Sequence, residues 1–122
     1  MYRIKNKTRF LAIKGYIKYV KTHVSVVGVA QKLGFHPNRQ NYIRCPLHEV
    51  GRPRDMEATA SLHLYAERGI WHCFGCGAHG DAFGLVKKHL GSQSAAFKFF
   101  RKHFHILPPY RAPKMYAKLC QR

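Results

Sequence analysis

Four residues with metal-binding side chains occur in two pairs of the same short spacing. Cys45 and His48 enclose two residues, and Cys73 and Cys76 do the same after a further 24 residues. Thiolates and imidazoles in such pairs are the ligands of tetrahedral zinc sites. We therefore predict one zinc ion held by these four side chains. A filled shell leaves no position for an activated water, so this zinc would be structural and its binding energy would go into folding.

Two alternatives to this ligand set follow from the same residues. His72 and His79 flank the second pair and are rival ligands, but His48 repeats the two-residue spacing in the opposite pair. The four cysteines could instead form two disulfides. The pairing of Cys45 with a histidine and the position of Cys120 in a basic segment favour a metal.

The charge of the chain indicates the kind of partner. Lysine and arginine total 22 and aspartate and glutamate total 5, which gives a net charge of +17 over 122 residues. Such an excess predicts a polyanionic partner, and it says little about the fold. No apolar run approaches the roughly 20 residues of a membrane span, and the N-terminal residues lack the pattern of a secretory signal. We predict a cytoplasmic protein that binds nucleic acid and no membrane.

Local sequence signals place the metal ligands on a small sheet. Residues 42–44 are expected to form a strand that leads into the first pair, and residues 61–65 alternate between apolar and polar side chains. A turn at 67–69 returns the chain as a partner strand over 70–73, so the second pair follows a hairpin. Helices are expected over 25–33, with Ser25 as cap, over 81–91, with Asp81 as cap and Leu90 inward, and from Ser92 or Ser94 to Pro108.

These elements predict an α+β fold: a zinc ribbon with a small antiparallel β-sheet flanked by short α-helices. Residues 1–23 form a basic N-terminal helix or arm, with Phe10, Ile13, Ile17 and Val20 at helical spacing. Residues 24–107 form the zinc-ribbon domain. Residues 108–122 are basic and lack periodicity, so we predict a mobile tail.

The motifs resemble a known family. Cys45-Pro46-x-His48, Thr59-x-Ser61 and Cys73-Phe-Gly-Cys-Gly, followed by Gly80-Asp81, are similar to the CHC-type zinc-binding domain of bacterial and phage DNA primases over roughly residues 24–106. The resemblance implies a ribbon that binds single-stranded template and helps a primase to start primers, while a separate domain makes the phosphodiester bonds. It also implies a bacterial cytoplasm or nucleoid, and a phage, plasmid or integrated element would suit a ribbon encoded alone.

The chain departs from the family pattern between the two metal-binding pairs. Ala58, Ala60 and Leu62 stand where the family has lysine, proline and an aromatic residue, and this segment is several residues longer. Arg52 and Arg54 lie in the longer segment and are candidates to replace the lost cation. The mode of template contact is therefore open.

A catalytic role is not expected. Nucleotidyl transfer needs clustered carboxylates that hold two metal ions, and the nearest approach to such a cluster is Asp55-x-Glu57, in a loop rich in glycine, arginine and proline. The chain also lacks a Walker loop and a nucleophile elbow. We expect a binding module without catalytic residues.

Binding of single strands combines cations with rings on which bases stack. The candidate nucleic-acid contacts are Arg44, Arg52, Arg54, His63, Tyr65, Arg68, Trp71 and Phe74. The expected partners are single-stranded DNA and a replication protein such as a primase catalytic subunit, a helicase or a polymerase. The alternatives are a basic zinc-finger regulator of duplex DNA or RNA, and a module that docks onto a helicase or polymerase.

Overall fold

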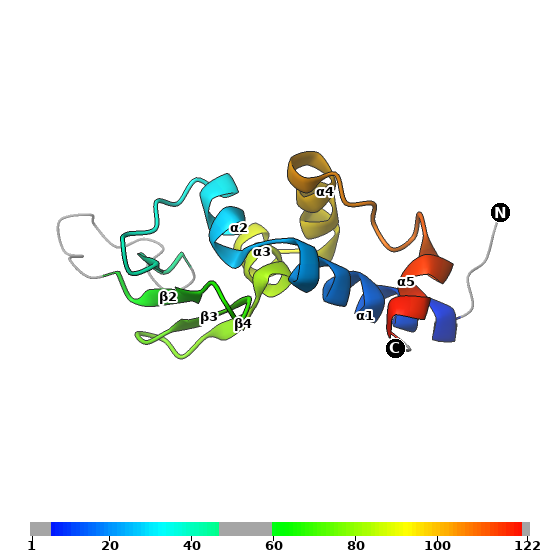
Figure 1. Cartoon of the computed structure of the whole chain (residues 1–122), viewed down its shortest axis with the longest axis horizontal. Helices are drawn as coiled ribbons and strands as arrows, with labels where there is room; N and C mark the ends of the chain where they lie inside the picture. Colours follow the sequence, from blue (N-terminus) through cyan, green and yellow to red (C-terminus); the bar gives the residue numbers. More distant parts are fainter. Residues whose placement is uncertain (1–5, 47–59, 121–122) are drawn as a thin grey trace.

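The computed structural model describes residues 6–46 and 60–120 (Figure 1). The described chain contains helices and an antiparallel sheet, which confirms the predicted α+β class. The elements in chain order are α1 (Asn6–His23), α2 (Val26–Lys32), β1 (Tyr42–Ile43), β2 (Leu62–Tyr65), β3 (Ile70–Cys73), β4 (His79–Asp81), α3 (Ala82–Leu90), α4 (Gln93–Phe104) and α5 (Pro113–Cys120). None of these helices is both long enough and apolar enough to span a membrane.

The four strands are arranged in the order β1-β2-β3-β4, and each pair is antiparallel. The predicted hairpin is confirmed, because Leu62 pairs with Cys73 and Tyr65 pairs with Ile70. Strand β4 was not predicted. Its three residues, His-Gly-Asp, have neither apolar alternation nor β-branched side chains, and the strand forms because the turn after β3 returns the chain alongside it.

Side chains alternate between the two faces of the sheet. Leu62, Leu64 and Trp71 are fully buried on one face, which α2 and α3 cover (Figure 1). The residues between them, including His63, Tyr65 and His72, lie on the opposite face and are partly exposed. We call this opposite face the outward sheet face.

The predicted helix caps are confirmed. The Ser25 hydroxyl accepts the Val27 and Gly28 N–H groups at the start of α2, and the Asp81 carboxylate accepts the Gly84 N–H at the start of α3. Of the two candidates for α4, Ser92 is the cap, since it accepts the N–H of Ala95 at 3.0 Å. The expectation that Leu90 points inward is wrong. It is exposed in the last turn of α3, beyond the reach of the core.

The C-terminal segment differs most from expectation. Residues 113–120 form α5, which packs along α1 (Figure 1), so the prediction of a mobile tail is wrong over these residues. The ring of Tyr116 meets Tyr16 edge-on at 5.4 Å and Tyr19 at 5.8 Å. A helix of eight residues is too short to show a clear repeat or to be stable by itself, and it is stabilised by packing on α1.

Helix α1 buries part of the predicted face. Val20 is buried and Ile17 packs against the core as predicted, but Phe10 is exposed. Ala12 and Tyr16, which were not predicted, are also buried. Tyr16 is the centre of this packing, because its ring contacts Phe83 of α3 and Phe97 of α4 at 5.6 and 5.0 Å. One hydrophobic cluster thus joins the helices to the sheet. The division of the chain at residues 23 and 107 stays a prediction.

Candidate metal centre and nucleic-acid face

Three of the four predicted ligands come together at one end of the sheet. Cys45 lies two residues beyond β1, Cys73 ends β3, and Cys76 lies in the turn between β3 and β4. Their Sγ atoms are all within 4.8 Å of one another, and the Sγ atoms of Cys45 and Cys76 are 4.0 Å apart. His48 lies outside the described residues, so its role as the fourth ligand stays a prediction.

This arrangement fits a zinc ion. Zn–S bonds of about 2.3 Å at tetrahedral angles place neighbouring sulfur atoms about 3.8 Å apart, close to the distance between Cys45 and Cys76. No disulfide joins any two of these three cysteines. Thiolate ligands in a tetrahedral set favour zinc over harder cations such as magnesium. A metal at this point would join β1 to the turn after β3.

The backbone shapes the turn that carries the second pair. The N–H of Gly77 donates to the carbonyl of Cys73 at 2.9 Å, and the N–H of Cys73 donates to the carbonyl of Ala78 at 2.8 Å. Gly77 has a positive φ of 79°, which glycine adopts without strain. The turn therefore directs Cys76 back toward Cys73.

The polar surroundings of Cys73 favour its thiolate. Burial acts to raise the pKa of this thiol, but hydrogen bonds from Ser61, from the backbone of Cys76 and Gly75, and from Cys45 outweigh it and bring the pKa to about 7. The hydroxyl of Ser61 lies 3.5 Å from the sulfur. Since the thiolate is the form that binds metal, these contacts prepare the site.

The two rival histidines stand apart from the cysteine cluster. Neither His72 nor His79 belongs to it within the part of the chain that the structure describes. His72 neighbours Cys73 on β3 and so projects from the opposite, outward sheet face, where its ring lies 4.6 Å from that of Phe74. The Nδ1 atom of His79 lies 3.3 Å from the carbonyl oxygen of Gly77.

Rings form a continuous row on the outward sheet face. The ring of His63 lies 4.3 Å from Tyr65 and 4.4 Å from Tyr42, and Tyr42 in turn lies 6.5 Å from Phe74. We call Tyr42, His63, Tyr65, His72 and Phe74 the ring row. Phe74 is 61% exposed and lies between two of the cysteines in sequence, so the row begins beside the metal centre.

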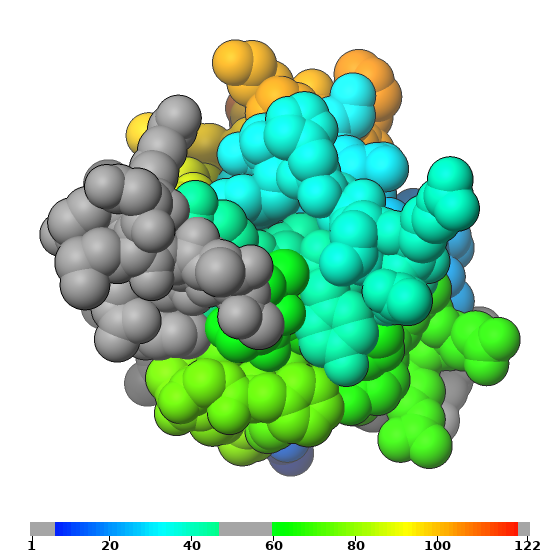
Figure 2. Space-filling model, turned by 90° about the vertical axis from the view of Figure 1, so that its left-hand side faces the viewer, coloured from blue at the N-terminus to red at the C-terminus, as the bar shows by residue number. Residues whose placement is uncertain are grey.

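Tyr42 was not among the predicted contacts. Its place in the ring row depends on the pairing of β1 with β2, which sets Tyr42 opposite His63. Figure 2 looks at the molecule from the end farthest from α5 and shows the segment around β1 (teal) against the strands (green). A two-residue strand has too little pattern to reveal its register from the sequence.

The prediction for Trp71 is wrong. It was predicted to offer its ring to a base, but it is fully buried on the face covered by the helices. Its Nε1–H donates to the carbonyl oxygen of Asp81 at 2.7 Å. Trp71 therefore joins β3 to the start of α3 and presents no ring face at the surface.

Charged residues of both signs flank this face in the described part of the chain. Arg44 and Arg68 are exposed, and Arg52 and Arg54 lie outside the described residues. Of the five acidic residues in the sequence, the described part contains Glu67 and Asp81, and the carboxylate of Asp81 is engaged as a helix cap. The charge that suits a polyanion is the net +17 of the whole sequence.

Comparison with known proteins identifies the family. The family model of the CHC2 zinc finger matches residues 13–107. The chain belongs to the CHC2 zinc finger family. This result confirms the resemblance seen in the sequence motifs, and together with the cysteine cluster it supports zinc binding.

Curated relatives of this CHC2 zinc finger are named DNA primase. Those of Chlamydia trachomatis and Lactococcus lactis are 43% identical over 63 residues and 35% identical over 72 residues. The matches cover 51% and 57% of this chain but 9% and 10% of those proteins. The primase of Deinococcus radiodurans is 43% identical over 44 residues, which are 36% of this chain and 6% of that protein. No solved structure matches significantly.

The match to the CHC2 zinc finger does not extend over the whole structure. It includes the cysteine cluster, the sheet, α3 and α4, but α5 and the first turns of α1 lie outside it. The packing of α5 on α1 is therefore a feature of this chain that the family model does not describe.

Proposed function

We propose that this CHC2 zinc finger binds single-stranded DNA template and assists a primase in starting primers, without catalysing the reaction itself. The observation that carries the proposal is the ring row on the outward sheet face, which runs beside the cysteine cluster on a strongly basic chain.

The ring row suits unpaired bases. A base in a duplex is stacked between its neighbours, whereas a base in a single strand can stack on a protein ring and gains about 1–3 kcal/mol by doing so. His63, Tyr65 and Phe74 are held by a hydrogen-bonded sheet and a tight turn, so little side-chain entropy is lost on binding. The nearby arginines, Arg44 and Arg68, supply the charge that attracts phosphates.

The zinc ion has a structural role in this proposal. One ion bound by Cys45, Cys73 and Cys76, with His48 as the fourth ligand, would fill the tetrahedral shell. Phe74 lies between two of these ligands, so that the metal would hold one end of the ring row in place.

The proposed module contributes no catalytic residues of its own. Two-metal nucleotidyl transfer needs a cluster of carboxylates, and within residues 6–46 and 60–120 the metal-binding cluster consists of cysteines alone. Asp55 and Glu57 lie outside the described residues. The primase relatives are about ten times longer than the matched segment, so we place the polymerising activity in another part of the protein or in a partner in the bacterial cytoplasm.

Fluorescence anisotropy with a labelled oligothymidine and a duplex of equal length tests the binding. Zinc-loaded protein should prefer the single strand, and Tyr65→Ala and Phe74→Ala should each weaken its binding about 5- to 150-fold, the equivalent of one lost stacking contact. Tyr110→Ala is the matched control, because Tyr110 is 60% exposed and lies on the loop between α4 and α5.

The outcomes separate the candidate functions. Equal or tighter binding of the duplex would favour a regulator of double-stranded DNA. Unchanged binding by folded Tyr65→Ala and Phe74→Ala proteins would reject the ring row as the contact surface. Adding the chain to a primase catalytic domain on single-stranded template should raise the rate of primer initiation, and no stimulation would reject the role in priming.

A further inference from the structure

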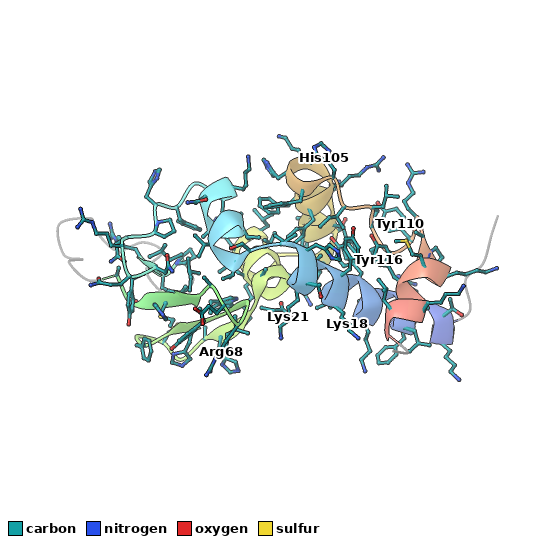
Figure 3. All side chains as sticks on the ribbon, viewed as in Figure 1. Lys18, Lys21, Arg68, His105, Tyr110 and Tyr116 are labelled. Atoms are coloured by element: carbon teal, nitrogen blue, oxygen red, sulfur yellow. The ribbon has the colours of Figure 1, made fainter. Side chains whose placement is uncertain are left out.

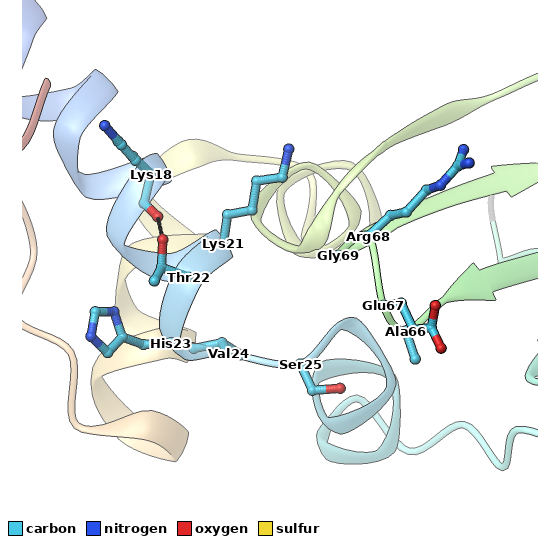
Figure 4. Close-up of a pocket in the computed structure, with 10 residues that line it drawn as sticks. All are labelled: Lys18, Lys21, Thr22, His23, Val24, Ser25, Ala66, Glu67, Arg68 and Gly69. Atoms are coloured by element: carbon cyan, nitrogen blue, oxygen red, sulfur yellow. Dashed lines mark hydrogen bonds between the residues drawn. The ribbon is translucent and has the colours of Figure 1, made fainter. Parts of the chain in front are cut away.

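A basic groove lies between the C-terminal end of α1 and the turn that joins β2 to β3 (Figure 4). Its volume is about 650 Å³, within the range of ligand sites. The groove is lined by Lys18, Lys21, Thr22, His23, Val24, Ser25, Ala66, Glu67, Arg68 and Gly69. It is separate from the cysteine cluster, which lies at the other end of the hairpin.

Two cations line the groove from different segments of the chain. The turn is tight, because the N–H groups of Arg68 and Gly69 both donate to the carbonyl of Tyr65, at 3.1 and 2.9 Å. The aliphatic stem of Lys21 lies over Gly69, where its Cγ is 3.6 Å from the place that a Cβ would occupy. Lys21 and Arg68 therefore reach the groove from opposite walls.

The charge of the groove is positive. Glu67 is the one carboxylate among its lining residues, against Lys18, Lys21 and Arg68. Figure 3 shows Arg68, Lys21 and Lys18 following one another along the same side of the molecule, from the sheet to α1. Lys18 also donates to the carbonyl of Leu119 at 3.3 Å, which ties this part of α1 to α5.

One hydroxyl group adds an uncharged hydrogen-bond donor to the groove. The Ser25 oxygen accepts the N–H groups of Val27 and Gly28, so its own hydrogen is available to an acceptor in the groove. The Thr22 hydroxyl already donates to the carbonyl of Lys18 at 2.9 Å. Two cations and a hydroxyl donor are a set that binds phosphate oxygens.

We propose that this groove binds a backbone phosphate of the same single strand whose bases lie on the ring row. The inference rests on the proposed function. Tyr65 is the last ring of β2, and Arg68 follows it in the turn, so a strand that passes over Tyr65 meets the groove next. The groove thereby extends the binding surface from the sheet to α1. The terminal phosphate of a free nucleotide offers the same oxygen acceptors and is the alternative ligand for this groove.

The salt dependence of binding tests this path. For single strands, each neutralised phosphate contributes about −0.7 to the slope of log K against log salt. The Lys21→Ala/Arg68→Ala protein should bind a long oligothymidine more weakly and with a slope shallower by about 0.7. Glu67→Gln should bind more tightly, since it removes the one negative charge. Lys98→Ala/Arg101→Ala is the matched control, because it removes the same two charges from the exposed side of α4.

The results distinguish this inference from the proposed function. If wild-type protein fails to bind the single strand, the proposed function and the groove both fail. If the wild type binds the single strand, the salt slopes decide about the groove. The groove alone is rejected if the Lys21→Ala/Arg68→Ala protein has the same salt slope as the wild type or as the α4 control. Saturable binding of a nucleoside triphosphate that the groove variant loses, with an unchanged oligothymidine slope, would assign the groove to free nucleotides and overturn the strand path.

Discussion

Replacing Gly15 with alanine tests the contact that holds α5 against α1. A Cβ at this position would overlap the backbone carbonyl oxygen of Tyr116 and lie 2.5 Å from its carbonyl carbon. Carbon atoms pack at about 3.5–4.0 Å, so α5 would have to retreat by roughly 1 Å or more. The obstacle is backbone, which cannot move aside by changing a rotamer.

The expected loss follows from two opposing effects. Overpacking costs about 1–3 kcal/mol, and a backbone clash belongs at the upper end of that range. Alanine in place of glycine favours an isolated helix by about 1 kcal/mol. We therefore expect Gly15→Ala to lower the free energy of unfolding by about 2 kcal/mol. The retreat of α5 would also loosen the fully buried Tyr116.

A second glycine provides the control. A Cβ on Gly28, in α2, would meet the Ser25 Cβ at an ordinary 3.7 Å, so Gly28→Ala should raise stability by up to about 1 kcal/mol. Urea unfolding of zinc-loaded protein can be followed by the emission of Trp71, the single and fully buried tryptophan. Gly15→Ala protein that is as stable as wild type would refute the close crossing of α1 and α5.

Three further predictions concern the metal centre and the core. Cys76→Ser should abolish zinc retention in native mass spectrometry and shift the Trp71 emission to the red, and a folded sheet without zinc would contradict the structural role of the metal. Trp71→Phe should lower the free energy of unfolding by about 1–3 kcal/mol, because it removes the hydrogen bond from Nε1 to the carbonyl of Asp81 and leaves a cavity where the larger ring is fully buried; an unchanged denaturation midpoint would count against this. Tyr16→Phe should stabilise the protein by about 1–3 kcal/mol, since the buried Tyr16 hydroxyl has no hydrogen-bond partner among the described residues. Burial raises the pKa of Tyr16 above its ordinary value of 10.0. The unfolded chain therefore loses this proton first as pH rises, and wild type should lose up to about 1.4 kcal/mol per pH unit above pH 10 relative to Tyr16→Phe. A constant difference in unfolding free energy between the two proteins from pH 9 to 11 would contradict that reasoning.

The features that were predicted correctly depend on neighbours in the sequence. The caps at Ser25 and Asp81 and the turn after Tyr65 are interactions over two to four residues, so the residue types reveal them directly. The alternation of Leu62 and Leu64 with His63 indicated which side chains face outward. The spacing of Cys73 and Cys76 indicated a turn that brings the two thiols together.

The features that were missed depend on contacts between distant segments. Strand β4 forms against β3 without apolar residues of its own, and α5 is stabilised by the close approach of Tyr116 to Gly15. Trp71 is buried because α3 begins at its edge, although an aromatic residue beside a metal-binding pair is equally compatible with base stacking. Residue types within one segment do not reveal which other segment will cover it.

By itself the sequence determined the cysteine and histidine spacing, the α+β class, the membership of the CHC2 zinc finger family and a charge that calls for a polyanion. These depend on residue type and on separations of a few positions. The tertiary structure decided which rings are exposed, because strand register sets Tyr42 beside His63 and turns Trp71 inward. It also decided that Lys21 and Arg68 share one groove. Those residues are 47 positions apart (68 − 21), and the packing of α1 against the end of the sheet brings them together.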